Sequence, residues 1–331
     1  MDIERFRIAI DLVALLPSSA TMPATSGRVL RQIDAPSGAT ILHAAELPGM
    51  ANEGSRPAIA IVAAGSTAHW RRASIHYSVD DGTTWIPAGT TAAPGVVGAV
   101  AAGAGAAPAT LEDRRHTIEL LLAHDGMMLT SADAAARDRG ENLALVGDEL
   151  LQFGTVRQIG PRRWRVSDLW RGRRGTLPAP ISAGARFVLI EPDALLSIAP
   201  DAAVGARVRV MARGVGDDSG VEEAVVLDGA SILPPAPVRL SARIADGVLT
   251  LQWRRRSRTD WSWRDEVNTL LGEEREAYQV TITTAASEPC HVATARPELV
   301  VPLATLGSAP VHVAVRQIGN NGASRAALLT L

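Results

Sequence analysis

Histidines, cysteines and closely spaced acids are the side chains that most often carry catalysis. The seven histidines are scattered, and none stands in an H-E-x-x-H or C-x-x-C frame. The sequence has neither a G-x-S-x-G nucleophile elbow nor a P-loop. Adjacent acids occur only in glycine-rich or charged stretches, where adjacency does not fix a carboxylate separation: Asp80–Asp81, Asp217–Asp218 and Glu273–Glu274. The sequence therefore predicts no enzyme activity, no catalytic residue, no metal site and no cofactor.

The sharpest local motif is a turn. Ser78, Asp80, Gly82 and Trp85 follow the spacing S-x-D-x-G-x-x-W, which resembles the Asp-box of sialidase-type propellers. Short polar side chains at these positions bond the backbone of a hairpin turn, glycine supplies positive φ, and tryptophan packs beneath. A sialidase would repeat the motif at blade spacing, and this chain has one copy. The motif therefore predicts a structural turn without chemistry.

A basic stretch runs from residue 157 to 174, with seven arginines against one acid, Asp168. Nucleic-acid phosphate is one candidate partner. The formal net charge of −2 and an aromatic content of 4% make it an unlikely one, because a base-stacking groove needs more aromatic residues. Gly172 and Gly175 bracket a tight turn, in which Arg171 and Arg174 are expected to bond carboxylates or backbone carbonyls. The alternative is a free basic surface.

The elements that position these residues are predicted to be mostly strands. Ile75, Tyr77 and Val79 alternate with polar residues, and closely spaced strand candidates follow from residue 143 onward. The Ala/Gly-rich segment 92–110 favours a flexible loop. With Cys290 as the only cysteine, no intrachain disulfide can form. No apolar run is long enough to span a bilayer, so we expect no membrane insertion.

Proline positions predict the domain organisation. Residues 1–56 are interrupted by prolines and favour an extended arm with short strands, followed by a β-rich domain over 57–233. The proline-rich linker 234–237 precedes about seven short strands in 238–331, which suit a fibronectin type III or immunoglobulin-like sandwich. Trp261 and Trp263 lie in a charged insert, where they are candidates for glycan contact or for anchoring the insert.

Two ordered segments carry a family resemblance. Residues 142–153 read N-L-A-L-V-G-D-E-L-L-Q-F, and residues 169–176 read L-W-R-G-R-R-G-T. With further matches around Trp253 and Tyr278, they resemble the C-terminal part of the tail-tip "megatron", the host-specificity or baseplate protein of gene transfer agents and siphophages. Trp170 departs from the leucine usual in that family. The residues that match belong only to the C-terminal part of the family protein, so the activity of its upstream hydrolase-like domain is not carried over.

The resemblance implies a structural component of a tail tip or baseplate, made in the bacterial cytoplasm and located in the virion. It implies a β-rich tail-hub-type domain followed by the sandwich, and other tail-tip and hub proteins as partners in a homotrimer. A host surface glycan is a further expected contact. The family motif that would form interfaces is Arg171, Gly172, Arg173, Arg174, Gly175 and Thr176. Two alternatives stay open: a carbohydrate-binding adhesin module and an accessory domain of a glycan hydrolase.

Overall fold

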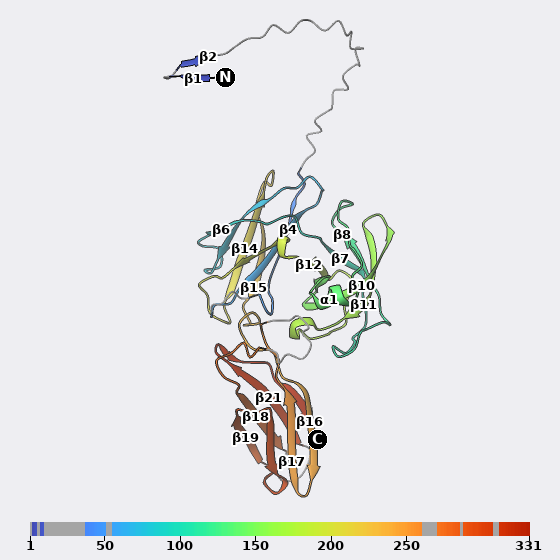
Figure 1. Ribbon diagram of the computed structural model, residues 1–331, viewed down its shortest axis with the longest axis vertical. Helices are drawn as coiled ribbons and strands as arrows, with labels where there is room; N and C mark the ends of the chain where they lie inside the picture. The colour runs from blue at the N-terminus through green and yellow to red at the C-terminus, as the bar shows by residue number, and fades with distance from the viewer. Residues whose placement is uncertain are drawn as a thin grey trace. The chain divides into compact units, whose positions relative to one another are not determined.

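The computed structural model describes two compact units, Met1–Ala35 and Pro36–Leu331. In the first unit, β1 (Asp2–Glu4) and β2 (Arg7–Ala9) form an antiparallel hairpin. Strands dominate the regular structure of the second unit, which confirms the predicted mostly β fold (Figure 1). Within the described part of the chain, no helix is long and apolar enough to cross a membrane. The described residues are 2–4, 7–9, 37–50, 55–259, 270–284, 287–306 and 311–331.

Two sheets pack against each other in the second unit, and they are called the paired sheets below. One has the order β13-β4-β3 and the other the order β15-β14-β5-β6, and all pairings are antiparallel. Ile61, Ile75 and Val210 belong to the core that joins the two sheets. The strands are β3 (Thr40–Glu46), β4 (Ile59–Gly65), β5 (Ala73–Ser78), β6 (Ile86–Thr90), β13 (Leu195–Ile198), β14 (Arg207–Gly214) and β15 (Val221–Val226).

A closed barrel is inserted between β6 and β13. Its strand order is β10-β11-β8-β7-β12-β9, with β9 returning to β10. Phe153 and Phe187 are fully buried at its centre. The elements are β7 (Val97–Ala102), β8 (Ile118–Leu122), α1 (Ala134–Asp138), β9 (Leu143–Val146), β10 (Glu149–Gly160), β11 (Arg163–Trp170), η1 (Arg173–Gly175), β12 (Arg186–Leu189) and, after the barrel, η2 (Pro192–Ala194).

Strand β4 joins the barrel to the paired sheets because both of its faces are buried. Ile59, Ile61 and Ala63 face the core shared with β5 and β14. The alternate residues Ala60, Val62 and Ala64 belong to the core of the barrel. Since successive side chains point to opposite faces of a strand, an unbroken apolar run is what a strand between two cores requires.

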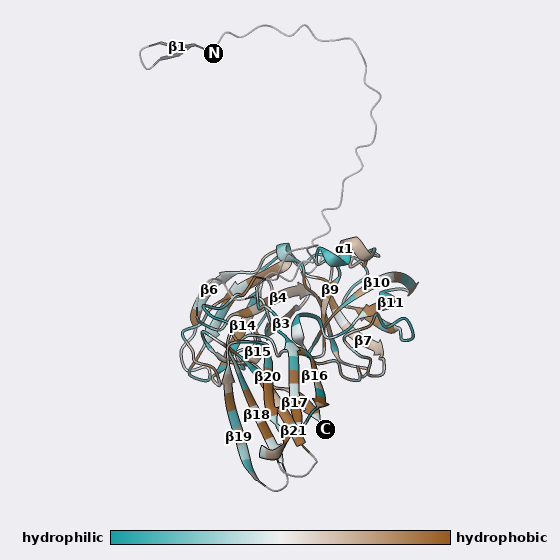
Figure 2. Cartoon of the chain, turned by 60° about the horizontal axis from the view of Figure 1, so that its bottom comes forward, coloured by the Kyte–Doolittle hydropathy of each residue, from teal (hydrophilic) through white to brown (hydrophobic). Residues whose placement is uncertain are grey.

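The C-terminal module is a two-sheet sandwich. Its sheets have the orders β16-β17-β20 and β19-β18-β21, with β23 and the short β22 both paired to β21. Apart from the short β22, this is the arrangement of a fibronectin type III domain. Hydrophobic residues line β17 and β21, while much of β19 is hydrophilic (Figure 2). The elements are β16 (Val238–Ala245), β17 (Val248–Arg254), β18 (Tyr278–Thr284), β19 (Ser287–Thr294), β20 (Glu298–Pro302), η3 (Leu303–Thr305), β21 (Val311–Gly319), β22 (Gly322–Ala323) and β23 (Ala327–Thr330).

The predicted domain boundaries differ from the structure at the N-terminal side. Strand β3 lies inside the predicted arm of residues 1–56, yet it pairs with β4 from Thr40 to Glu46. Pro36 and Pro48 flank this strand instead of interrupting it, so proline density alone placed the boundary too late. At the other end, β16 begins at Val238, directly after the prolines of 234–237.

His43 lies where the paired sheets meet the barrel. It lines a cavity of about 10 Å³ together with Leu145 and Val188 of the barrel. Burial, and to a lesser degree the positive charge of Arg186, lowers the pKa of His43 to about 4. The folded protein therefore holds this imidazole neutral at pH values where a solvated histidine is protonated.

We expect this histidine to weaken the fold in acid. Because the folded pKa is lowered from 6.5, its stabilising effect is complete above pH 6.5 and is lost as the pH falls toward 4. The loss amounts to at most about 3 kcal/mol of unfolding free energy, at 1.36 kcal/mol for each pKa unit. Urea titrations of native protein and of His43→Gln at several pH values measure it.

The difference in unfolding free energy between native protein and His43→Gln separates the effect of His43 from that of groups with the opposite dependence on pH. Burial raises the pKa of Glu46 and of Glu223, and such acids add stability as the pH falls. His69→Gln, at an exposed position, is the matched control and should keep the pH dependence of the native protein. Parallel curves for native protein and His43→Gln between pH 6.5 and 4 would contradict the prediction.

Candidate functional site: a buried arginine network in the barrel

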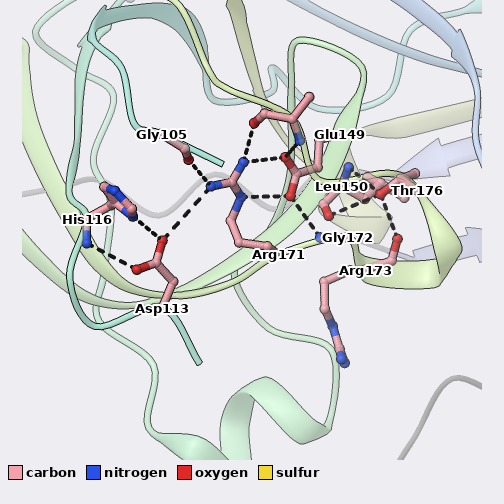
Figure 3. A network of polar contacts seen from close by, with 10 residues as sticks. Gly105, Asp113, His116, Glu149, Leu150, Arg171, Gly172, Arg173 and Thr176 are labelled. Carbon is pink, nitrogen blue, oxygen red and sulfur yellow. Dashed lines mark hydrogen bonds and ion pairs between the residues drawn. The ribbon is translucent and has the colours of Figure 1, made fainter. Parts of the chain in front are cut away.

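Arg171 follows β11 and meets the first residue of β10. Its Nε and Nη2 donate to the two carboxylate oxygens of Glu149 at 2.8 and 2.7 Å. The side chains of Arg171 and Glu149 are 0% and 4% exposed. Figure 3 shows this two-pronged pair at the centre of the network. The planar guanidinium matches the carboxylate in geometry as well as in charge.

Backbone groups supply the other hydrogen-bond partners of Arg171 and Glu149. Arg171 Nη1 donates to the carbonyl of Gly105 at 3.0 Å, and Nη2 donates to the carbonyl of Ala179 at 2.5 Å. The amide of Gly172 donates to Glu149 Oε1 at 2.8 Å. One ion pair thus holds together the loop after β7, the start of β10 and the segment after β11. A buried pair persists when such bonds offset the cost of removing both charges from water.

Asp113 and His116 extend the network (Figure 3). His116 Nδ1 lies 2.8 Å from Asp113 Oδ2, which is 4.0 Å from Arg171 Nη1. Burial acts to raise the pKa of Asp113, but hydrogen bonds from the His116 side chain and from the amides of His116 and Arg115 hold it below its ordinary value. In the described residues, the ring of His116 bonds no hydroxyl or thiol. The contact therefore orders the loop that precedes β8.

The other residues of the family motif also make structural contacts. Arg173 lies 5.3 Å from the ring centre of Trp170, and Arg174 Nη1 donates to the carbonyl of Pro48 at 3.3 Å. Thr176 Oγ1 accepts from the amide of Leu150 at 3.0 Å and donates to the carbonyl of Arg173 at 2.9 Å. Burial lowers the pKa of both Arg173 and Arg174.

The turn needs left-handed backbone at three of its positions. Gly172, Arg174 and Gly175 have φ angles of 60°, 52° and 85°. A Cβ on Gly172 would also lie 2.9 Å from the side chain of Pro178. The glycines thus permit the tight bend that the sequence predicts.

Three acids lie close to the turn in sequence or in the barrel, and only one of them binds Arg171. Glu149 binds Arg171, whereas Asp148 contacts Arg186 at 3.2 Å and Asp168 accepts from Thr155. Sequence reasoning missed Asp113 and His116. They precede β8 in a segment without a motif, and a pairing between residues 113 and 171 leaves no local signal.

The Asp-box-like turn forms a separate polar cluster. Ser78 Oγ donates to Asp80 Oδ1 at 2.7 Å and accepts from the amide of Gly82 at 2.8 Å. The hydrogen bond from Ser78, followed by that from the Thr84 amide, lowers the pKa of Asp80 to about 2. Trp85 is half-buried and lies 5.7 Å from the guanidinium carbon of Arg209. These contacts hold the hairpin turn that joins β5 to β6.

Trp261 and Trp263, the glycan candidates, lie outside the described residues. Among the residues that are described, no group of three or more His, Cys, Asp or Glu side chains could hold a metal ion.

One family model matches part of the chain. The family described as Rcc01698-like, C-terminal, matches residues 95–188. This family is associated with gene transfer agent proteins. The match coincides with the barrel, whose strands begin at Val97 and end at Leu189. No curated protein matches the chain.

Solved structures with similar strand patterns are remote. Rat CD45 domains d3–d4 share 9% identity over 34% of this chain, at a TM-score of 0.24, and the match spans 55% of that chain. Chicken CNTN1 FN1–FN3 shares 11% identity over 89% of this chain and 97% of its own, at 0.22. A two-domain fibronectin type III segment of chicken tenascin shares 12% identity over 70% and 98%, also at 0.22. The description of the C-terminal module therefore rests on its strand order.

Proposed function

We propose that this chain is a structural component of the tail tip or baseplate of a gene transfer agent or related phage-like particle. The observation that supports it best is the coincidence of the family match, residues 95–188, with one closed barrel. The motif that carries the resemblance lies in that barrel. There Arg171 is buried and bonded to Glu149, and Thr176 ties the turn to β10.

The proposed role is to supply rigid β domains that dock onto other tail-tip and hub proteins in a homotrimer. The shared strand β4 supports this role, because a domain joined to its neighbour by a common core transmits position without a hinge. The proposal gives the chain no catalytic step. Contact with a host surface is left to the C-terminal module.

The location of the chain in purified particles tests the proposal. A tagged copy, expressed in the source bacterium, should sediment with nuclease-protected particles and be labelled by immunogold at one end of the tail. Arg171→Met should be lost from the particles because the barrel loses its buried pair. Arg139→Met, which affects the exposed pair of Arg139 and Glu141, should be retained. A chain found only outside the particles would overturn the proposal.

A further inference from the structure

A polar cleft lies on the barrel beside α1, apart from the Arg171 network. Its volume is about 620 Å³, within the range of small-molecule sites. It is open to solvent and brings together side chains from the segment before β8, the start of α1, and strands β10 and β11. The side chains that matter for recognition are those of Glu112, Ser131, Asp133, Arg137, Thr155 and Asp168.

Asp168 holds a strained position in this wall. Its φ of 56° is left-handed, although it is a non-glycine residue inside β11. Arg137 Nη1 donates to its carbonyl at 2.9 Å, and Thr155 Oγ1 donates to its Oδ2 at 2.5 Å. Glycine would adopt this backbone without strain, so aspartate here places a carboxylate in the cleft at a cost to the fold.

Arg137 brings a buried donor that lacks an acceptor. The residue is 9% exposed, and its Nη2 donates to Glu112 Oε1 at 2.7 Å. Its Nε has no hydrogen-bond partner among the described residues. Buried donors are nearly always paired. Because the Nε atom is shielded from solvent, a bound molecule could supply the missing acceptor only after the Arg137 side chain shifts.

The charged groups of the cleft are of both signs and partly neutralise one another, because Arg114 and Arg137 both pair with Glu112. The carboxylates of Glu112, Asp133 and Asp168 oppose an anion, and the guanidinium groups of Arg114 and Arg137 oppose a cation. The described residues also offer no three-ligand group for a metal ion. A neutral ligand is therefore the kind that faces no charge of its own sign in the cleft.

The hydrogen-bonding groups of the cleft that the fold does not use include both donors and acceptors. Asp133 uses Oδ1 to cap α1 at the amide of Ala136, which leaves its Oδ2 as an acceptor. Arg137 Nε remains a donor, and Ser131, whose Oγ accepts from the amide of Val156, keeps its hydroxyl hydrogen. Sugar hydroxyls donate and accept in the same way. We propose that this cleft binds a neutral saccharide.

This inference does not rest on the proposed role in a particle. A tail component that binds no sugar here, or a sugar-binding protein that belongs to no particle, would each leave one of the two ideas standing. The inference rests on other residues than Trp261 and Trp263, the glycan candidates of the sequence.

Saturation-transfer NMR on the full chain tests the cleft, with glucose, galactose, N-acetylglucosamine and their short oligomers as probes. At least one should bind, and Asp168→Gly should weaken that binding about tenfold or more, because a charged acceptor is lost. The melting temperature of Asp168→Gly should change little, since the relief of backbone strain offsets the loss of the hydrogen bond from Thr155. A purely structural role for Asp168 would not separate binding from stability in this way.

Asp81→Gly is the matched control. Asp81 also has a left-handed φ, 58°, and it lies in the Asp-box-like turn, outside the barrel. This variant should bind the same sugar as the native chain. The inference is overturned if no probe binds, or if binding survives Asp168→Gly. Binding of Ca²⁺ or inorganic phosphate that depends on Asp168, in place of a neutral sugar, would also overturn it.

Discussion

Glu149→Gln is expected to lower the unfolding free energy of the barrel by about 3–5 kcal/mol, the cost of breaking a buried ion pair. The substitution keeps the shape of the side chain and removes only its charge. Arg171, whose side chain is 0% exposed, then keeps its positive charge without the carboxylate that lies 2.7 Å away. Amide hydrogen exchange in β10 and β11 under increasing urea measures the loss in the barrel itself.

A second variant separates the lost charge from lost packing. Arg171→Met combined with Glu149→Gln removes both charges, so it should recover part of the stability lost in Glu149→Gln alone. Arg139→Met is the surface control. Arg139 and Glu141 are 67% and 56% exposed, and such pairs contribute about 1 kcal/mol or less. A loss of unfolding free energy below about 1 kcal/mol in Glu149→Gln would contradict the prediction. It would show that water or a movement of the chain stabilises the unpaired charge of Arg171.

The arginine turn could be predicted in part because its chemistry is local. Crowded arginines need acceptors, and the glycines at 172 and 175 mark where the chain bends. Which acid would meet Arg171 could not be predicted, because the pairing of the strand that Glu149 begins with β11 is seen only in the structure. The carbonyls of Gly105 and Ala179 could not be predicted, because backbone acceptors carry no residue type.

The barrel shows why strand propensity fails at close contacts. The Ala/Gly-rich segment 92–110 was expected to be a flexible loop, and this prediction was wrong for β7 (Val97–Ala102). A Cβ on Gly98 would lie 2.3 Å from the carbonyl oxygen of Leu121, so the strand needs a residue without a side chain there. Low complexity in this stretch reflects close packing between strands and not mobility.

Topology was equally hidden from the sequence. Leu196 of β13 pairs with Ile61 of β4, although the whole barrel lies between them in the chain. No local pattern marks such a pairing. The sequence shows a short apolar run from Ala58 to Ala63, and only the structure shows that the two faces of this strand serve two different cores. The left-handed φ of Asp168, which shapes the cleft, likewise has no signature in a single sequence.

Residues 236–331, expressed alone, are expected to unfold cooperatively, and Trp253→Ala is expected to cost that segment about 3–5 kcal/mol. The core of the module supports independent folding, because its buried residues run from Leu249 to Val315 and none belongs to the cores of the barrel or the paired sheets. Trp253 is 2% exposed, and its ring meets Tyr278 edge-on at a centroid distance of 5.2 Å. Removing the indole leaves a cavity between the two sheets.

Leu328→Ala is the control for this change, since Leu328 lies on β23 and is 77% exposed. It should shift the unfolding free energy by about 0.5 kcal/mol or less, as surface substitutions usually do. Urea unfolding followed by far-UV circular dichroism measures both variants, and coincident transitions by a second probe establish the two-state behaviour that the comparison needs. A segment without a cooperative transition would mean that the module depends on the rest of the chain. The exposed ion pair of Arg325 and Asp228 would then be the first contact to examine, because it joins the module to the loop that follows β15.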